Sequence, residues 1–163
     1  SALTGHLVLS TLHTNTAAGA IIRLKDMGVE GYLITSSVNG ILAQRLVRTL
    51  CKECKAPYVP PEAEWKSSGL SRFCELGTPV YKPVGCSQCR QTGFRGRTGI
   101  HELMPLDEKI RTAILAGKDA SELNSIDSRD GMLSLHEDGL RKVMDGVTSL
   151  DELARVTQDQ SDA

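Results

Sequence analysis

Four of the five cysteines stand in two pairs with the spacing of metal knuckles. The pairs read CKEC, from Cys51 to Cys54, and CSQC, from Cys86 to Cys89. A C-x-x-C pair folds into a tight turn that aims both sulfurs at one ion, and four thiolates complete the tetrahedral shell of a structural zinc. The sequence therefore predicts a closed Zn²⁺ site made by Cys51, Cys54, Cys86 and Cys89, with no open coordination position for catalysis.

Spacing alone leaves other chemistries open for these cysteines. Two disulfides would require an oxidising compartment, and two independent redox pairs would require a thioredoxin-like unit that the sequence does not show. Iron can occupy the same four sulfurs. A zinc deaminase does not fit, because His101 and Glu102 are adjacent and do not form H-x-E. The fifth cysteine, Cys74, is interpreted as a free thiol without function.

Four thiolates around a divalent ion leave about two negative charges, which nearby cations are expected to offset. The cations close to the pairs in sequence are Arg48, Lys52, Lys55 and Arg90. With this role, these side chains need no nucleic-acid partner.

His13 is a second candidate for chemistry, because it ends the apolar run that includes Leu7, Val8, Leu9 and Leu12. Parallel sheets bind ligands beyond the carboxyl ends of their strands. An imidazole placed there can donate a hydrogen bond to a terminal phosphate or to an attacking water. Position alone also allows a polar residue that only marks where the chain leaves the core.

The elements that would position these residues follow from apolar spacing. Residues 7–12 predict a strand buried on both faces, and a helix capped by Asn15 follows it up to Gly28 or Gly31. Residues 32–50 predict a second helix, although Asn39-Gly40 leaves a β-hairpin open. Asp107 to Ala116 predicts a helix. Capping-box spacing predicts three more short helices, at Asp119 with Glu122, Ser134 with Glu137, and Ser149 with Glu152.

Composition excludes several classes of protein. The 19 basic and 20 acidic residues give a net charge of −1, and aromatic residues make up 4% of the chain, so an extended nucleic-acid surface is not expected. No apolar run approaches the roughly 18 residues of a membrane-spanning helix, and the start has no signal-peptide pattern. We therefore expect a cytoplasmic protein. Because the chain opens without Met directly before the predicted strand, we also expect a fragment.

Four ordered blocks resemble the bacterial ATPases of type II secretion and type IV pilus assembly. TGHLVLSTLHTN resembles the histidine box of that family, and LAQRLVRTLC resembles the helix that leads into its cysteine module. CRQTGFRGRTGIHELM resembles its second zinc knuckle, and the block from GMLSLHEDGL to LARVT resembles its C-terminal helical part. The form GRTGIHEL favours the type II secretion branch, with a type IV pilus extension ATPase as the alternative.

The resemblance implies an α/β fragment in three parts. These are the C-terminal part of a RecA-like nucleotide-binding core (1–50), a tetracysteine zinc module (51–104) and a helical subdomain (105–163). The parent would be a cytoplasmic hexameric ring that uses ATP and Mg²⁺ and binds platform proteins of the inner membrane. His13 would sense phosphate in that full-length protein.

The chain has no G-x-x-x-x-G-K-[ST] loop and no acidic Walker B strand, so we expect no ATP turnover from it alone. We also expect the fragment to dimerise or to swap its N-terminal strand, because that strand lacks sheet neighbours. A stand-alone zinc adaptor that binds protein or nucleic acid is the competing function from the binding class. Thiol redox catalysis would need cysteines that titrate freely.

Overall fold

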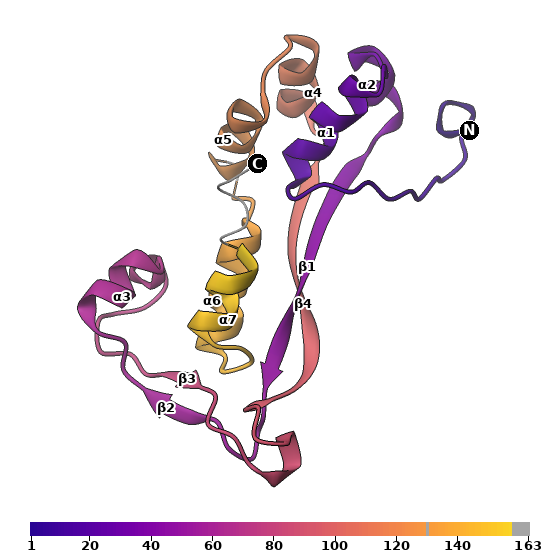
Figure 1. The fold of residues 1–163 in the computed structure, drawn as a ribbon. Coiled ribbons are helices and arrows are strands. Elements are labelled where there is room, and N and C mark those ends of the chain that lie inside the picture. The colour runs from indigo at the N-terminus through magenta and orange to yellow at the C-terminus, as the bar shows by residue number, and fades with distance from the viewer. Residues whose placement is uncertain (130, 158–163) are drawn as a thin grey trace. The chain divides into compact units, whose positions relative to one another are not determined.

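The computed structural model describes residues 1–129 and 131–157, without the side chains of 127–129. This part of the chain is mixed α/β, with seven α-helices and four strands (Figure 1). It divides into two compact units, which are Ser1–Ala43 with Glu102–Ser134, and Gln44–His101 with Leu135–Ala163. Among the described helices, none has the length and apolar character that crossing a membrane requires.

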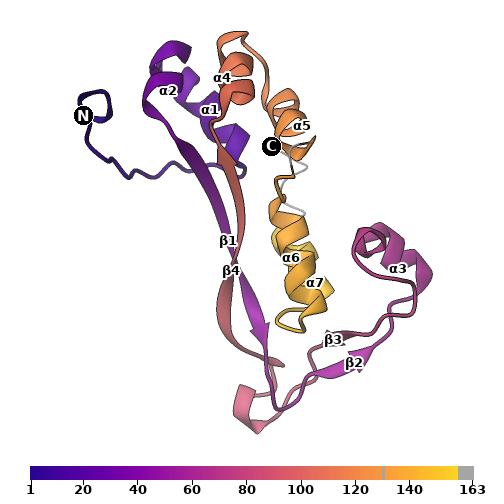
Figure 2. The same ribbon diagram turned by 180° about the vertical axis from the view of Figure 1, so that it is seen from behind.

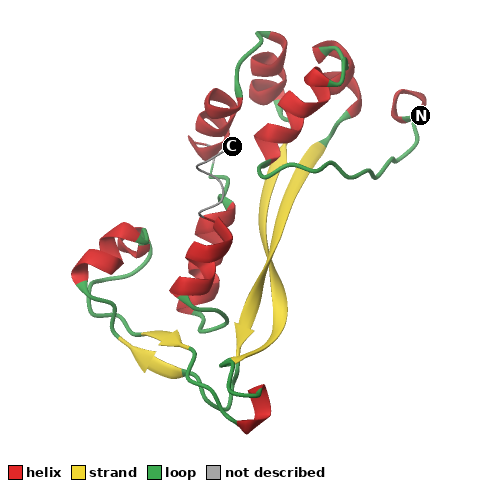
Figure 3. Cartoon of the chain, in the orientation of Figure 1, coloured by secondary structure: helices red, strands yellow, loops and turns green. Residues whose placement is uncertain are grey.

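The two longest strands, β1 (Gly40–Leu50) and β4 (Phe94–Pro105), form a two-stranded ribbon (Figure 3). Hydrogen bonds at its ends show that the strands are antiparallel. Leu106 N–H donates to the Asn39 carbonyl at 3.0 Å, and Cys51 N–H donates to the Gly93 carbonyl at 2.9 Å. The strands cross in opposite views, as strongly twisted two-stranded ribbons do (Figure 2).

The helix predicted over residues 32–50 is wrong from residue 38 onward. Only α2 (Gly31–Ser37) is helical there, and β1 follows. The buried residues of β1 are Ala43, Val47 and Leu50, at steps of four and three. Exposed and covered residues alternate from Gly40 to Arg48, which is the pattern of a strand with one covered face. The β-hairpin alternative is also wrong, since Asn39-Gly40 joins a helix to a strand whose partner is β4.

The first unit contains four helices. They are α1 (Ala17–Asp26), α2, α4 (Glu108–Leu115) and α5 (Ala120–Arg129). Helix α1 packs on α2 and α5, and α4 packs on α2 and α5. The largest fully buried side chains of this unit are Ile21, Ile34, Met104, Ile110, Ile114 and Leu123.

Of the two helix caps predicted in this unit, the one at Asp119 is confirmed and the one at Asn15 is wrong. Asp107 caps α4, with its carboxylate accepting from Ile110 N–H at 2.9 Å. Asp119 and Glu122 form the predicted reciprocal capping box at the start of α5, at 2.9 and 3.2 Å. The cap of α1 is Thr16 instead of the predicted Asn15, since Thr16 Oγ1 accepts from Gly19 N–H at 3.0 Å.

The strand predicted over residues 7–12 is not present, so this prediction is wrong for the described structure. A short 3₁₀ helix, Ala2–Thr4, leads into an extended segment without strand pairing. Leu7 and Leu9 are 84% and 88% exposed. The apolar pattern of residues 7–12 suits a buried strand. However, none of the described strands pairs with this segment, so its backbone N–H and C=O groups have no strand partner.

The second unit contains a small sheet and three helices. Strands β2 (Ala56–Tyr58) and β3 (Val80–Lys82) pair antiparallel, with Tyr58 opposite Val80. The helices are α3 (Glu62–Ser67), α6 (Leu135–Met144) and α7 (Leu150–Thr157). Helices α6 and α7 confirm the short helices predicted after Ser134 and Ser149. The last residues of the predicted helical subdomain, 158–163, lie outside the described part.

Helices α6 and α7 approach closely at Gly139. A Cβ at this position would lie 2.1 Å from Cδ1 of Leu153 on α7. Leu140, Val143 and Leu153 are buried with it. The glycine therefore sets the distance between the two helices.

Candidate metal centre

The four paired cysteines lie together at one place in the second unit. Their sulfur atoms are all within 4.8 Å of one another. Individual Sγ–Sγ distances are 3.9 Å for Cys51 and Cys86, 3.8 Å for Cys54 and Cys89, and 3.7 Å for Cys86 and Cys89. A tetrahedron with Zn–S bonds of about 2.3 Å has edges of about 3.8 Å. The four sulfurs therefore have the spacing needed to hold a metal ion.

Each cysteine pair forms a tight backbone turn. At the end of β1, the N–H groups of Cys54 and Lys55 both donate to the Cys51 carbonyl, at 3.3 and 3.0 Å. The second pair contains a 3₁₀ turn, Ser87–Cys89, after which Arg90 and Gln91 adopt φ of 52° and 64°. This left-handed conformation is uncommon for residues other than glycine. It lets Gln91 N–H donate to the Cys86 carbonyl at 2.9 Å.

Two glycines shape the backbone around the sulfurs. Gly85 and Gly93 have φ of 118° and 74°, and a Cβ would lie 2.9 Å from Gln91 O or 2.4 Å from Pro83 Cβ, respectively. Their N–H groups donate to Cys54 Sγ at 3.3 Å and to Cys89 Sγ at 3.2 Å. Only glycine fits at these positions, and each brings a backbone donor to a sulfur.

These contacts give Cys54 and Cys89 very different pKa values. Burial alone would raise the pKa of Cys89, but N–H donors from Cys86 and Gly93 outweigh it and lower the pKa to about 6. Burial and the neighbouring sulfurs raise the pKa of Cys54 to about 11, against the N–H of Gly85. Four sulfurs this close cannot all be thiolates without a cation. A bound divalent ion would supply that charge and deprotonate all four.

Two of the cations expected to offset the thiolate charge have other partners. Arg48 Nη2 lies 2.6 Å from Glu152 Oε2, and its guanidinium lies 4.1 Å from the ring centroid of Phe94. Lys55 Nζ donates to the Gly146 carbonyl at 2.8 Å. Lys52 and Arg90 are exposed. The expected charge offset therefore does not come from direct contacts of Arg48 or Lys55.

Glu152 is a buried charge that the local sequence does not indicate. Its side chain has no exposed surface, and it binds the guanidinium groups of Arg48 and Arg155 and the N–H of Arg48. Burial alone would raise the pKa of Glu152, but the two arginines lower it to about 2. Its own N–H donates to Ser149 Oγ at 3.3 Å, so only half of the predicted capping box forms there. The only sequence signal was that Ser149-x-x-Glu152 spacing.

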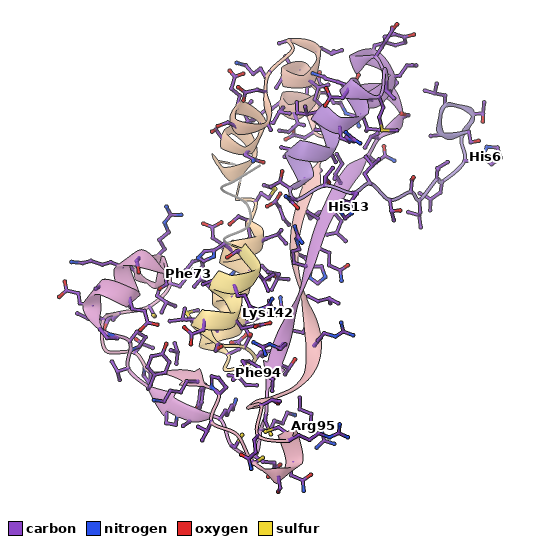
Figure 4. The ribbon with its side chains drawn as sticks, viewed as in Figure 1. His6, His13, Phe73, Phe94, Arg95 and Lys142 are labelled. Atoms are coloured by element: carbon purple, nitrogen blue, oxygen red, sulfur yellow. The ribbon has the colours of Figure 1, made fainter. Side chains whose placement is uncertain are left out.

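The histidines differ from their predicted surroundings. His13 is exposed, on the extended segment just before α1, in the unit that does not contain the cysteines (Figure 4). Its role in phosphate sensing stays a prediction. His136 is half-buried, with Nε2 2.8 Å from the Ser68 carbonyl and Nδ1 3.0 Å from Thr157 Oγ1. Sequence spacing gave no sign of these two partners.

A tetracysteine centre built from the turns that follow β1 and precede β4 is thus the defining site of this chain. Its sequence belongs to the type II/IV secretion system protein family, whose profile matches residues 1–155. The chain is 50% identical over 161 residues to the type II secretion system protein E of Dickeya dadantii, covering 98% of this chain and 31% of that protein.

Two further relatives show how the family branches. The type IV pilus assembly ATPase PilB of Thermus thermophilus is 49% identical over 159 residues, covering 97% of this chain and 18% of PilB. The type II secretion system ATPase E of Vibrio cholerae is 48% identical over 161 residues, with 98% and 31% covered. The chain thus spans less than a third of the length of each of these relatives.

Proposed function

We propose that this chain is the C-terminal part of a hexameric ATPase that powers protein export by type II secretion. The observation that carries the proposal is the 50% identity to a type II secretion system protein E, over 98% of the chain. Residues 1–50 would complete a RecA-like nucleotide-binding core, residues 51–104 a zinc module and residues 105–163 a helical subdomain. This family assignment favours a motor over a stand-alone zinc adaptor or a thiol redox catalyst.

The extended segment before α1 supports a place for residues 7–12 within a larger core. These residues have the apolar pattern of a strand covered on both faces, yet Leu7 and Leu9 are almost fully exposed here. In the parent protein, neighbouring strands of the nucleotide-binding sheet would cover them. Without such neighbours, the same segment would pair with a second copy of the chain, by dimerisation or strand exchange.

Zinc is the ion proposed for the four cysteines, with a structural role. The sulfur spacing, the closed set of four ligands and the backbone donors to Cys54 and Cys89 all support a tetrathiolate site. Elemental analysis of protein purified from zinc-containing medium should find about one zinc per chain. Cys89→Ser should reduce that content strongly, whereas Cys74→Ser, the matched control outside the cluster, should leave it unchanged.

His13 is proposed to sense the terminal phosphate in the full-length protein. Its place directly before α1 would let an imidazole contact a nucleotide and pass a change in that contact to the helix. We expect His13→Ala in the full-length protein to lower ATP turnover much more than nucleotide affinity. Equal losses in both would point to a packing role instead. The chain alone, without phosphate-binding loop or Walker B strand, should give no turnover above background.

Type IV pilus extension is the second candidate, because PilB matches this chain at 49% identity. The two functions differ in what the motor assembles and not in the metal centre. Deletion of the full-length gene from its own host separates them. Loss of exported protein with pili retained supports the type II assignment, and loss of pili with export retained supports the alternative. In either case, we propose that the motor is cytoplasmic and reaches the inner membrane through platform proteins.

A further inference from the structure

The segment GRTGIHEL contains a buried acid for which the proposed function gives no role. Glu102 lies in β4 between the exposed residues His101 and Leu103, yet it is only 4% exposed. A carboxylate removed from water costs several kcal/mol unless hydrogen bonds replace its hydration. The groups that it contacts therefore indicate what it does.

Glu102 holds the start of helix α1. Its Oε1 accepts from the N–H of Ala17, the first residue of α1, at 2.8 Å and across 85 positions of sequence. The first N–H groups of a helix have no partner within the helix and carry partial positive charge, so a carboxylate is stabilising there. Thr16 Oγ1 accepts the N–H of Gly19, and a Cβ on Gly19 would lie 2.9 Å from that oxygen. One local and one distant acceptor thus fix this turn.

The fixed turn lies close in sequence to His13. Ala17 and Ala18 are fully buried, and the three residues that connect them to His13 are half-buried. A chain of four residues reaches at most about 14 Å. Anchoring Ala17 therefore limits the volume in which the imidazole can move. The extended segment enters α1 at this point, with His13 at the junction (Figure 4).

We propose that Glu102 is a positioning residue for His13, acting through the first turn of α1. The inference rests on the proposed role of His13 and adds the anchor that holds it. Because the carboxylate already occupies the N-terminus of α1, the N–H of Ala17 is not available to a nucleotide phosphate.

The test is a double-mutant cycle in the full-length protein, with steady-state ATP hydrolysis as the assay. His13→Ala and Glu102→Ala should each lower kcat at least about tenfold, with the KM for ATP within about twofold of wild type. The double variant should be no slower than His13→Ala, because Glu102 acts only through the position of His13. Glu102→Gln keeps an acceptor for Ala17 and should restore kcat to within about threefold. Glu108→Gln, at the exposed start of α4, is the matched control and should change nothing.

Hydrogen–deuterium exchange on this chain tests the anchor without any catalysis. Glu102→Ala should speed exchange of amides 14–19 about tenfold or more, with the amides of α4 unchanged. Unchanged exchange there, or losses in kcat that multiply in the double variant, would overturn the inference. A slow His13→Ala with a fully active Glu102→Ala overturns the inference and leaves the proposed function standing. A fully active His13→Ala, by contrast, overturns the proposed function itself.

Discussion

Replacing Glu152 with Gln should destabilise the second unit strongly at neutral pH. The pKa of this carboxyl is lowered from the ordinary 4.5 to about 2, against the effect of its burial. That difference corresponds to about 3 kcal/mol of stability at pH 7. Arg48 and Arg155 remain 47% and 60% exposed, so water can solvate them when the carboxylate is gone. We therefore expect a loss of about 2 to 3 kcal/mol.

The pH dependence has a definite sign. Because the folded pKa lies below the unfolded one, the contribution of Glu152 is fully present above about pH 4.5 and is lost as pH falls toward 2. Wild type and Glu152→Gln should therefore differ by the same amount at pH 7 and pH 5. The difference should fall below about half by pH 3. The amide introduced by Glu152→Gln would also direct N–H donors at two guanidinium groups, which adds to the cost at neutral pH.

Urea unfolding followed by Trp65 fluorescence measures this difference, with saturating zinc in both proteins. Trp65 is the only tryptophan of the chain and lies in α3 of the same unit. The matched control is Glu62→Gln, which removes an ion pair with Lys66 of 2.6 Å whose two side chains are more than 60% exposed. Its effect should stay below about 0.5 kcal/mol. Equal effects of the two variants, or a Glu152 difference that persists undiminished at pH 3, would refute the reasoning.

Three further changes test other parts of the structure. Metal removal by a chelator should unfold residues 51–104 first, because structural tetrathiolate zinc contributes about 10 kcal/mol or more of folding free energy. Unchanged far-UV circular dichroism and protease resistance would contradict this prediction. Gly139→Ala should lower the melting temperature by several degrees, because overpacking against Leu153 costs about 1 to 3 kcal/mol. An unchanged melting temperature would mean that α6 and α7 are not held at this distance. Thr16→Ala should lower the free energy of unfolding in urea by about 1 kcal/mol, whereas Thr16→Ser should lower it little. Equal losses in the two variants would contradict a capping role for the Thr16 hydroxyl.

Signals that act over a few residues were predictable from the sequence. The two C-x-x-C pairs gave the candidate metal centre, and capping-box spacing gave the start of α5. Each of these depends on groups three or four positions apart, whose geometry is set by the local backbone. Such signals need no knowledge of the rest of the fold.

Features that depend on distant partners were not predictable. The spacing of Ile41, Leu42 and Leu46 fits a helix until β4 is known to be the neighbour that makes the segment a strand, in which Leu42 and Leu46 are exposed. Glu152 reads as one half of a capping box until Arg48, 104 positions earlier, is placed beside it. The strand predicted at residues 7–12 fails for the same reason, because a strand needs a second strand.

The interleaved order of the two units also bears on how the chain is made. The first unit needs residues 102–134 to complete it, and the second needs the helices that begin at Leu135. A ribosome releases the chain from its N-terminus at about 5 to 20 residues per second, and domains usually fold as they emerge. Helices α1 and α2 leave the ribosome before α4 and α5, so their apolar side chains stay uncovered until those helices follow. Nascent copies of this chain should therefore be chaperone clients until translation has passed well beyond the second cysteine pair.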